Sequence, residues 1–175
     1  DDRNVSATPV PISLYDQTTL FTAGSTSRNN RYMFHSMDAT IGSQTNDFWL
    51  FAGTGNYTNL NDAGVADKNA VDNLLIGIKD KAYPKFQTVD ATGIDGLTKC
   101  NDTTNDSTGA NCPEDADLGW YIKLESSTTS ARKKVTAEPT VSRGIVYFPI
   151  YKPNDTNICN LGDAFICAAD DECGT

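Results

Sequence analysis

The chain has 175 residues, which is enough for one domain with a buried core. Its 23 acidic and 14 basic side chains give a formal net charge of −9. This charge argues against a phosphate-binding surface, because non-specific nucleic-acid binding needs clustered Lys and Arg. The densest basic cluster, Arg132-Lys133-Lys134, is typical of a solvated strand approach. No apolar run approaches the roughly 20 residues of a membrane span.

The start of the chain predicts extended structure. Residue 1 is Asp and no signal-peptide pattern follows it, so we expect a mature or excised piece. Residues 1–13, which contain two prolines, are expected to form an extended linker or strand, and residues 14–175 a single β-rich domain. The weak apolar runs 18–23 and 32–37, joined by a polar connection, predict a hairpin-like pair.

Three stronger strands follow. Residues 47–57 combine aromatic side chains with two closing glycines, and residues 73–79, Asn-Leu-Leu-Ile-Gly-Ile-Lys, are apolar enough to be buried on both faces. Residues 119–124, Gly-Trp-Tyr-Ile-Lys-Leu, predict the next strand. The segments between them, at 59–72 and 80–118, are polar or irregular and predict loops, of which 97–118 is the most acidic.

The segment 134–151 predicts two short strands joined by a turn at Ser142-Arg143-Gly144. Gly144 can adopt the positive φ that a tight turn needs. The run Ile145-Val-Tyr-Phe-Pro-Ile-Tyr151 is almost continuously β-branched or aromatic. Pro139 and Pro149 lack an N–H, so we place them at strand ends, edges or bulges. Because a lone strand pair is unstable, this hairpin requires partners in this chain or in another.

A last strand is predicted at 164–169, after a second cysteine-containing loop at 152–163. No window shows a sustained helical period with caps. The sequence therefore predicts an all-β protein with several short antiparallel strands, long polar loops and disulfide staples. Its architecture is expected to be sandwich-like or a partial β-propeller.

The five cysteines, Cys100, Cys112, Cys159, Cys167 and Cys173, are all disulfide candidates. Cys100 and Cys112 flank a loop without apolar residues, so a disulfide between them is predicted to hold it, contributing roughly 3 kcal/mol. One bridge is expected among the other three cysteines, leaving one thiol free or paired beyond the chain. Zinc is disfavoured, because the sequence has no C-x-x-C pair and one His. This cysteine usage indicates an oxidising, extracytoplasmic compartment.

No motif predicts a catalytic, cofactor-binding or metal site. Gly53-Thr54-Gly55 follows a strand in the manner of a dinucleotide fingerprint, but the third Gly and the helix are missing, which favours a tight turn. His35 has no ligand-type partner at a suitable spacing and predicts a half-exposed strand residue. No G-x-S-x-G elbow nominates a serine nucleophile.

Six Asp residues with crowded neighbours lie in predicted loops, where a general acid would be poorly desolvated. They are Asp90, Asp95, Asp102, Asp106, Asp115 and Asp117. Calcium is a fairer hypothesis, but residues 101–114 do not keep the spacing of an EF-hand loop, so solvated loops are favoured. Most strand aromatics are expected in the core, and some remain candidates for an exposed platform that binds a glycan or a protein. These aromatics are Trp49, Tyr57, Trp120, Tyr121, Tyr147, Phe148 and Tyr151.

Three segments together resemble the C-terminal β-propeller region of PilY-type proteins, the secreted assembly factors and tip adhesins of type IV pili. They are residues 47–57 with the later Leu75-Ile-Gly-Ile-Lys-Asp80, the segment Gly119-Trp-Tyr-Ile-Lys-Leu124, and the hairpin 134–151 with the cysteine-bearing loop after it. The resemblance covers about residues 8–175. The family's propeller is longer than this chain, and its acidic calcium-binding loop has no match here, so no calcium ligand is carried over.

The resemblance implies a non-enzymatic extracellular module that acts in pilus assembly, retraction control, twitching motility or surface adhesion. Its expected partners are pilins, minor pilins, or another chain that completes the sheet. An alternative is a self-assembling or pilin-like surface filament subunit whose exposed strands pair with a second chain. A propeller enzyme, such as a quinoprotein dehydrogenase or a glycosidase, is a third interpretation that lacks a supporting motif.

Overall fold

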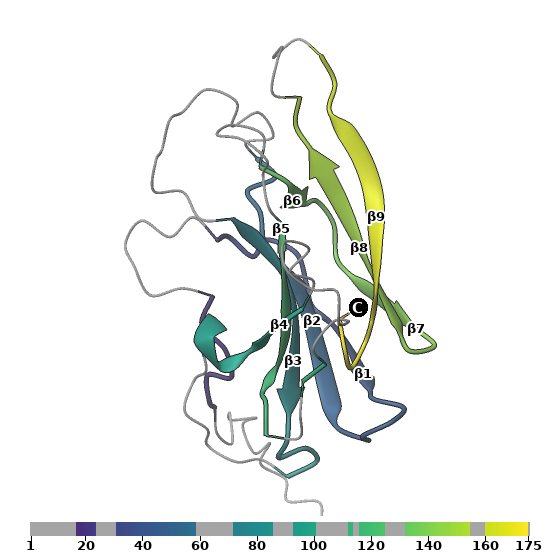
Figure 1. Ribbon diagram of the computed structural model, residues 1–175. Helices are drawn as coiled ribbons and strands as arrows, with labels where there is room; N and C mark the ends of the chain where they lie inside the picture. Colours follow the sequence, from purple (N-terminus) through teal and green to yellow (C-terminus); the bar gives the residue numbers. More distant parts are fainter. Residues whose placement is uncertain are drawn as a thin grey trace, which may run out of the picture.

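A computed structural model gives the architecture of the chain (Figure 1). It describes residues 17–23, 31–58, 72–85, 93–100, 112–113, 116–124, 132–154 and 160–174. Within these residues, nine strands form two β-sheets, so the chain is all-β as the sequence predicts. The predicted boundary between residues 13 and 14 lies outside the described residues.

Sheet one contains five of these strands. In spatial order they are β1 (Asp38–Ile41), β2 (Phe48–Gly53), β3 (Asn73–Asp80), β5 (Gly119–Leu124) and β4 (Thr98–Cys100). Neighbouring strands run antiparallel, except that β4 and β5 are parallel. A short 3₁₀ helix, η1 (Ile94–Gly96), precedes β4.

Sheet two is built around β8 (Ile145–Lys152), which pairs along its whole length with β9 (Asp163–Asp170). The opposite side of β8 is shared by two shorter strands, β6 (Lys134–Val135) near its end and β7 (Thr140–Ser142) near its beginning. All pairs in this sheet are antiparallel. In Figure 1 sheet two stands beside sheet one, and β8 and β9 extend beyond it at one end.

The two sheets pack face to face over one apolar core, in a sandwich-like arrangement. Alternate residues of β8, namely Val146, Phe148 and Ile150, point into this core because side chains of a strand alternate between its faces. Sheet one contributes Trp49, Phe51, Leu75, Cys100, Trp120, Ile122 and Leu124 to the same cluster.

The outer face of sheet one is covered as well. Leu74, Ile76 and Ile78 of β3 form a second cluster there with Leu97, and residues such as Leu20 and Phe21 pack against it. Strand β3 is therefore buried on both faces, as its apolar run predicts.

The strong strand predictions are confirmed: residues 47–57 contain β2, 73–79 lie in β3, 119–124 form β5, and 164–169 lie in β9. The hairpin predicted from residues 18–23 and 32–37 is wrong, because Phe21 makes only an isolated bridge and residues 31–37 contain no strand. Strand β1 was missed, and so was β4 inside the predicted loop 97–118. Both lie at the edges of sheet one, where a segment becomes a strand by pairing with its neighbour and needs few apolar residues.

Pro149 lies within central strand β8, at a discontinuity of its ladder. Its carbonyl accepts a hydrogen bond from the N–H of Thr136, so the missing N–H of Pro149 faces the same side. On that side β6 has ended and β7 has not begun, and residues 136–139 fill the interval. The proline therefore costs no strand-to-strand hydrogen bond, which agrees with the expectation from the sequence.

Candidate functional site

The chain ends its second sheet in a turn, residues 170–174, that folds back onto Trp120 of sheet one. The indole Nε1–H of Trp120 donates a 2.9 Å hydrogen bond to the carbonyl oxygen of Asp171. Gly174 has φ +74, and a Cβ at this position would lie 2.6 Å from the Trp120 ring. Glycine is required here both by the backbone conformation and by the contact. We call residues 170–174 the C-terminal turn.

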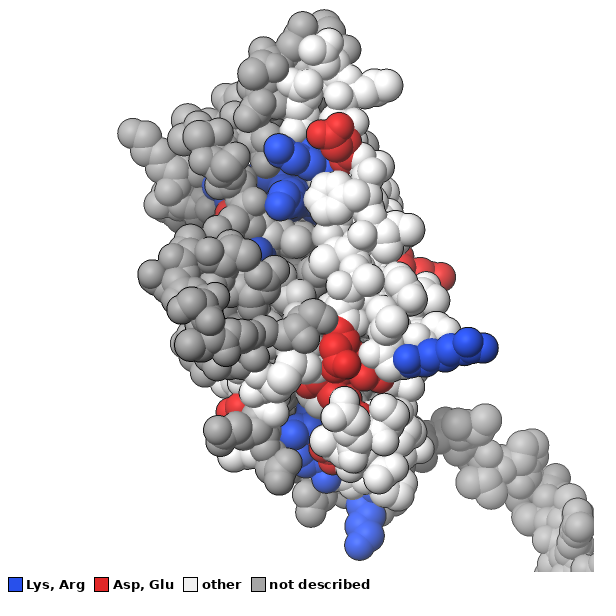
Figure 2. Space-filling model, turned by 45° about the vertical axis from the view of Figure 1, so that its right-hand side comes forward, with Lys and Arg blue, Asp and Glu red and all other residues white. Residues whose placement is uncertain are grey.

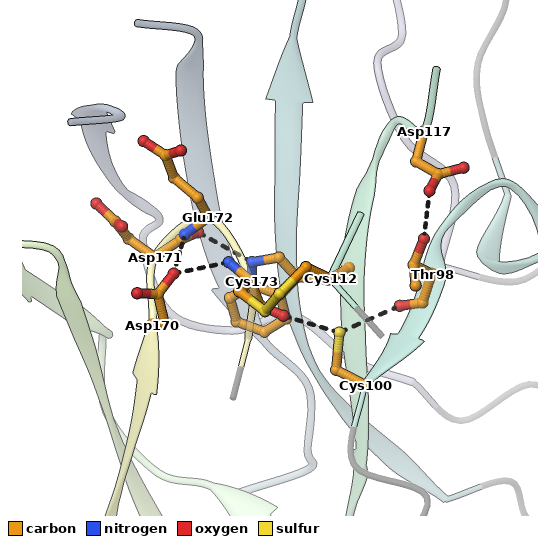
Figure 3. Close-up of a disulfide and its surroundings, with 9 residues drawn as sticks. Thr98, Cys100, Cys112, Asp117, Asp170, Asp171, Glu172 and Cys173 are labelled. Atoms are coloured by element: carbon orange, nitrogen blue, oxygen red, sulfur yellow. Dashed lines mark hydrogen bonds between the residues drawn. A yellow bond between two sulfur atoms is a disulfide. The ribbon is translucent and has the colours of Figure 1, made fainter. Parts of the chain in front are cut away.

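A disulfide between Cys112 and Cys173 ties the C-terminal turn to the segment that precedes β5 (Figure 3). The two cysteines are 61 residues apart in sequence. The predicted Cys100–Cys112 pairing is therefore wrong, and Cys173 does not pair within the group formed with Cys159 and Cys167. Cys167 is a free, half-buried thiol, and Cys159 lies outside the described residues.

Cys100 lies directly below the turn, at the end of β4. Its thiol donates to the carbonyl oxygen of Cys173 at 2.9 Å and lies 3.7 Å from the carbonyl oxygen of Thr98 (Figure 3). Burial raises the pKa of this thiol to about 11, so it stays protonated at neutral pH. Cys100 is the last residue of β4, and its side chain lies in the core. The sequence predicts a loop at this position and therefore does not reveal that the thiol is buried.

The acidic residues at either end of the triplet Asp170-Asp171-Glu172 bind backbone rather than solvent. Asp170 Oδ1 accepts from the N–H groups of Glu172 at 3.0 Å and Cys173 at 2.8 Å. Glu172 Oε1 accepts from the N–H of Gln44 at 2.8 Å in the turn between β1 and β2. Glu172 therefore fastens the C-terminal turn to sheet one a second time.

Asp171 is 2% exposed. Its burial, followed by repulsion from the carboxylates of Asp170 and Glu172, raises the pKa of its carboxyl above the ordinary value. Hydrogen bonds from backbone N–H groups oppose this shift in part. The C-terminal turn therefore carries electrostatic cost at neutral pH that its disulfide and hydrogen bonds offset.

A cavity of about 350 Å³ lies beside the turn, lined in part by Trp49, Lys79, Glu172 and the disulfide. The ammonium group of Lys79 is buried, 3.6 Å from Asp47 Oδ2 and 5.8 Å from the centre of the Trp49 ring. The indole N–H of Trp49 is buried without a hydrogen-bond partner. The cavity thus brings a buried ammonium group and carboxylates together beside the ring of Trp49. The sequence does not predict this site, because its residues come from separate segments of the chain.

The other described residues that the sequence singled out as candidates do not lie beside the cavity. His35 is half-buried in a bend rather than a strand, with its ring centre 5.2 Å from that of Tyr57. Asp117 accepts a hydrogen bond from the Thr98 hydroxyl at 2.8 Å. The backbone of Asp95 lies in η1. The remaining crowded carboxylates, Asp90, Asp102, Asp106 and Asp115, lie outside the described residues.

Gly53-Thr54-Gly55 marks a close approach of the two sheets. A Cβ on Gly53 would lie 2.5 Å from the Val135 side chain, and one on Gly55 would lie 2.7 Å from that of Lys134. The Thr54 carbonyl accepts from the Val135 N–H at 3.2 Å, while its hydroxyl accepts from the Leu74 N–H at 2.8 Å. The motif is therefore the end of β2 and its extended continuation, where the missing side chains let β6 approach, and not the tight turn that the sequence predicts.

The strand aromatics divide between core and surface, with fewer of them fully buried than the sequence predicts. Trp49, Trp120 and Phe148 are core residues, whereas Tyr57 and Tyr147 remain exposed. Tyr57 packs edge-to-face on Phe34, which stacks on Tyr32, and all three are exposed. Among the described residues, no group of three or more His, Cys, Asp or Glu side chains is arranged to hold a metal ion. Nor does the described part contain a helix long and apolar enough to cross a membrane.

The fold defines an all-β protein whose two packed sheets are joined by a disulfide. Its structure is similar to the crystal structure of the C-terminal domain of Pseudomonas aeruginosa PilY1, with a TM-score of 0.62 over 89% of this chain and 13% sequence identity. The chain spans about a third of that protein chain, because the alignment covers 34% of it. No protein-family model and no curated protein sequence matches this chain.

Proposed function

We propose that the chain is part of a non-enzymatic, extracellular module of a type IV pilus-associated protein. The observation that carries this proposal is the fold similarity to the PilY1 C-terminal domain, which extends over 89% of the chain. The three sequence segments that resemble PilY-type proteins add support, since each has a defined place in this fold. The Gly-Thr-Gly segment lies where the sheets meet, Trp120 hydrogen-bonds to the C-terminal turn, and the hairpin forms much of sheet two.

The roles that follow from this proposal are pilus assembly, twitching motility or surface adhesion. A pilin or minor pilin, or another chain completing a sheet or a propeller, would be the protein partner. The exposed aromatic cluster of Tyr32, Phe34 and Tyr57 is suited to a glycan or a surface, because aromatic faces stack on apolar ring faces. The disulfide supports an oxidising location outside the cytoplasm.

A non-enzymatic role is supported by the bonding of the acidic residues. The carboxylates of Asp170 and Glu172 are engaged by backbone N–H groups that hold the C-terminal turn in place. These two carboxylates therefore have a structural role in this fold, which the proposal of a non-enzymatic module accounts for.

The test uses cells that produce the native polypeptide containing this chain. Surface appendages are sheared off, and an antibody against the chain measures its amount in the pilus fraction. We expect co-purification with pili and its loss from the same fraction in an isogenic strain that cannot assemble pili. Equal recovery from both strains would contradict pilus association, and a soluble secreted marker protein serves as the control for leakage.

A second candidate function is a surface filament subunit that a strand from another chain completes. The observation that favours it is β9, an eight-residue strand that pairs with β8 and with no other described strand. The two functions differ in the amount of the chain that the appendage fraction contains. A filament subunit would be abundant along the appendage, whereas an assembly factor would be scarce.

A further inference from the structure

Three aromatic side chains form an exposed cluster at the surface of the protein. Tyr32, Phe34 and Tyr57 retain 46%, 47% and 43% of their accessible surface. The ring centres of Tyr32 and Phe34 lie 5.5 Å apart at an interplanar angle of 30°, and those of Phe34 and Tyr57 lie 5.1 Å apart at 88°. Single exposed apolar side chains are ordinary, whereas a contiguous group of exposed rings indicates a binding surface.

Hydrogen bonds to distant parts of the chain hold the aromatic cluster in place. The N–H of Gly55 donates to the carbonyl oxygen of Tyr32 at 2.9 Å. The guanidinium of Arg31 donates to two backbone carbonyl oxygens, and the Ser36 hydroxyl donates to Glu138 Oε2, 102 residues away in sequence. The positions of the rings are therefore set before a ligand arrives, which lowers the conformational cost of binding.

Polar groups flank the aromatic cluster and distinguish between kinds of ligand. Glu138 is exposed and uses one carboxylate oxygen for Ser36, shortly after Phe34 in sequence, so its other oxygen remains an acceptor. Asn56, which precedes Tyr57, accepts hydrogen bonds through its carboxamide oxygen, so its NH₂ group remains a donor. An acyl chain would remove water from these groups without replacing their hydrogen bonds, which costs free energy. A saccharide offers C–H groups for the rings and hydroxyls that both donate and accept.

Charge disfavours an anionic ligand. The chain carries a formal net charge of −9, and the charged group that flanks the cluster through Ser36 is the carboxylate of Glu138. In Figure 2, the Lys and Arg side chains on the face shown lie in small groups separated by uncharged and acidic residues. Acidic saccharides and anionic lipid surfaces would therefore be repelled, whereas an uncharged saccharide would not.

We propose that the aromatic cluster binds an uncharged pyranose of a glycan, one that presents several C–H groups on a single face, as a β-galactoside does. The C–H face packs on the rings of Phe34 and Tyr57, and hydroxyls at its edge bond to Glu138 and Asn56. This inference rests on the surface-adhesion role proposed above, because it names the ligand class of that role.

The probe is methyl β-D-galactopyranoside, and saturation-transfer NMR on the full chain measures which of its protons contact the protein. Two matched compounds serve as controls. Galactitol has the hydroxyls without a ring face, and the methyl galactoside uronate carries a carboxylate in place of the CH₂OH group. We expect the galactoside to bind with a Kd of about 1 mM and to receive saturation most strongly on one ring face. Galactitol should not bind, and the uronate should bind at least ~3-fold more weakly at low salt.

Phe34→Leu and Tyr57→Leu each remove a ring and keep an apolar side chain at an exposed position. Each should weaken galactoside binding by about 3-fold to 10-fold, because a ring face contributes this much, and should change the urea midpoint of unfolding little. Tyr83→Leu is the control and should bind normally. Tyr83 is as exposed, at 51%, but stacks on Phe48 at the other end of β2.

The proposal is overturned if the galactoside receives no saturation at ~10 mM, if galactitol or the uronate binds equally well, or if both ring substitutions leave binding unchanged. Binding to phosphatidylcholine vesicles or self-association that Phe34→Leu abolishes would also overturn it, by making a lipid or a second copy the occupant. Galactoside binding without recovery in the pilus fraction would reject pilus association alone. Recovery in that fraction without galactoside binding would reject this inference alone.

Discussion

Asp171 illustrates how one side chain can oppose the fold that surrounds it. Its main chain stabilises the fold, because its carbonyl oxygen accepts a hydrogen bond from the indole N–H of Trp120 and its N–H donates to the carbonyl oxygen of Gly144. Its carboxyl is buried beside two further acids, which raises its pKa. A carboxyl with a folded pKa above its unfolded value binds protons more tightly in the folded state, so its contribution to stability falls as pH rises through the folded pKa.

Asp171→Asn should therefore stabilise the chain at about pH 7, where the native carboxyl is ionised, and change stability less at about pH 4. Urea unfolding of both proteins at the two pH values measures this difference. Asp163→Asn, at the exposed end of β9, serves as the control and should alter stability little. If the Asp171→Asn variant is equally destabilised at both pH values, the carboxylate instead has a structural role.

At the scale of elements, the contact between β2 and β6 depends on the absence of a side chain at Gly53. A Cβ there would meet Val135 at 2.5 Å, whereas one on Gly93 would meet nothing within 4 Å. Gly93 also has an extended backbone, with φ −97 and ψ −175, that alanine can adopt. The two glycines therefore form a matched pair for testing how closely the sheets approach.

Gly53→Ala should lower the free energy of unfolding by about 1–3 kcal/mol through overpacking, while Gly93→Ala should stay within about 0.5 kcal/mol of the native chain. Chemical denaturation measures both. In a double-mutant cycle, Gly53→Ala should cost less when Val135 is already alanine. If both substitutions lower the free energy of unfolding equally, the close approach of the sheets at Gly53 does not contribute to stability.

Elements with long apolar runs could be predicted from the sequence, and short edge strands could not. Residues 73–79 are apolar on both faces, and residues 145–151 form a nearly unbroken β-branched and aromatic run. Few structures other than an inner strand of a sheet can bury such segments. By contrast β4, Thr98–Cys100, is a strand because it lies alongside β5, and nothing in three residues reveals that. The disulfide corner was hidden for the same reason, since proximity of Cys112 and Cys173 is created by tertiary packing.

At the scale of the whole molecule, the Cys112–Cys173 disulfide links the two sheets across 61 residues of chain. The loop-closure relation for a loop of this length gives about 4 kcal/mol, and native disulfides of this kind contribute about 2–5 kcal/mol. Together with the Trp120–Asp171 hydrogen bond, it fixes sheet two to sheet one at the end where the core is capped.

Cys112→Ala and Cys173→Ala should each reduce stability by about 2–5 kcal/mol, and the double substitution should cost little more than either one, because both remove one bond. Cys167→Ala is the control, since its thiol lies outside any disulfide. Thermal unfolding measures the three effects, and peptide mapping without reductant identifies the bond. A mapped Cys100–Cys112 peptide would contradict the assigned pairing.

This connectivity imposes an order of events on a chain that emerges N-terminus first. An oxidase meets Cys100 and Cys112 together well before Cys173 appears, so the first bond it can form is the non-native one between neighbours. Reaching the native pair then requires thiol–disulfide exchange, in which a thiolate attacks the misplaced bond. Once sheet two closes over Cys100, burial keeps that sulfur protonated and unreactive. Exchange should therefore be fastest before the core closes over Cys100. We expect a disulfide isomerase to raise the yield of the Cys112–Cys173 form, and oxidative folding with and without such an enzyme measures the neighbour-paired form that remains.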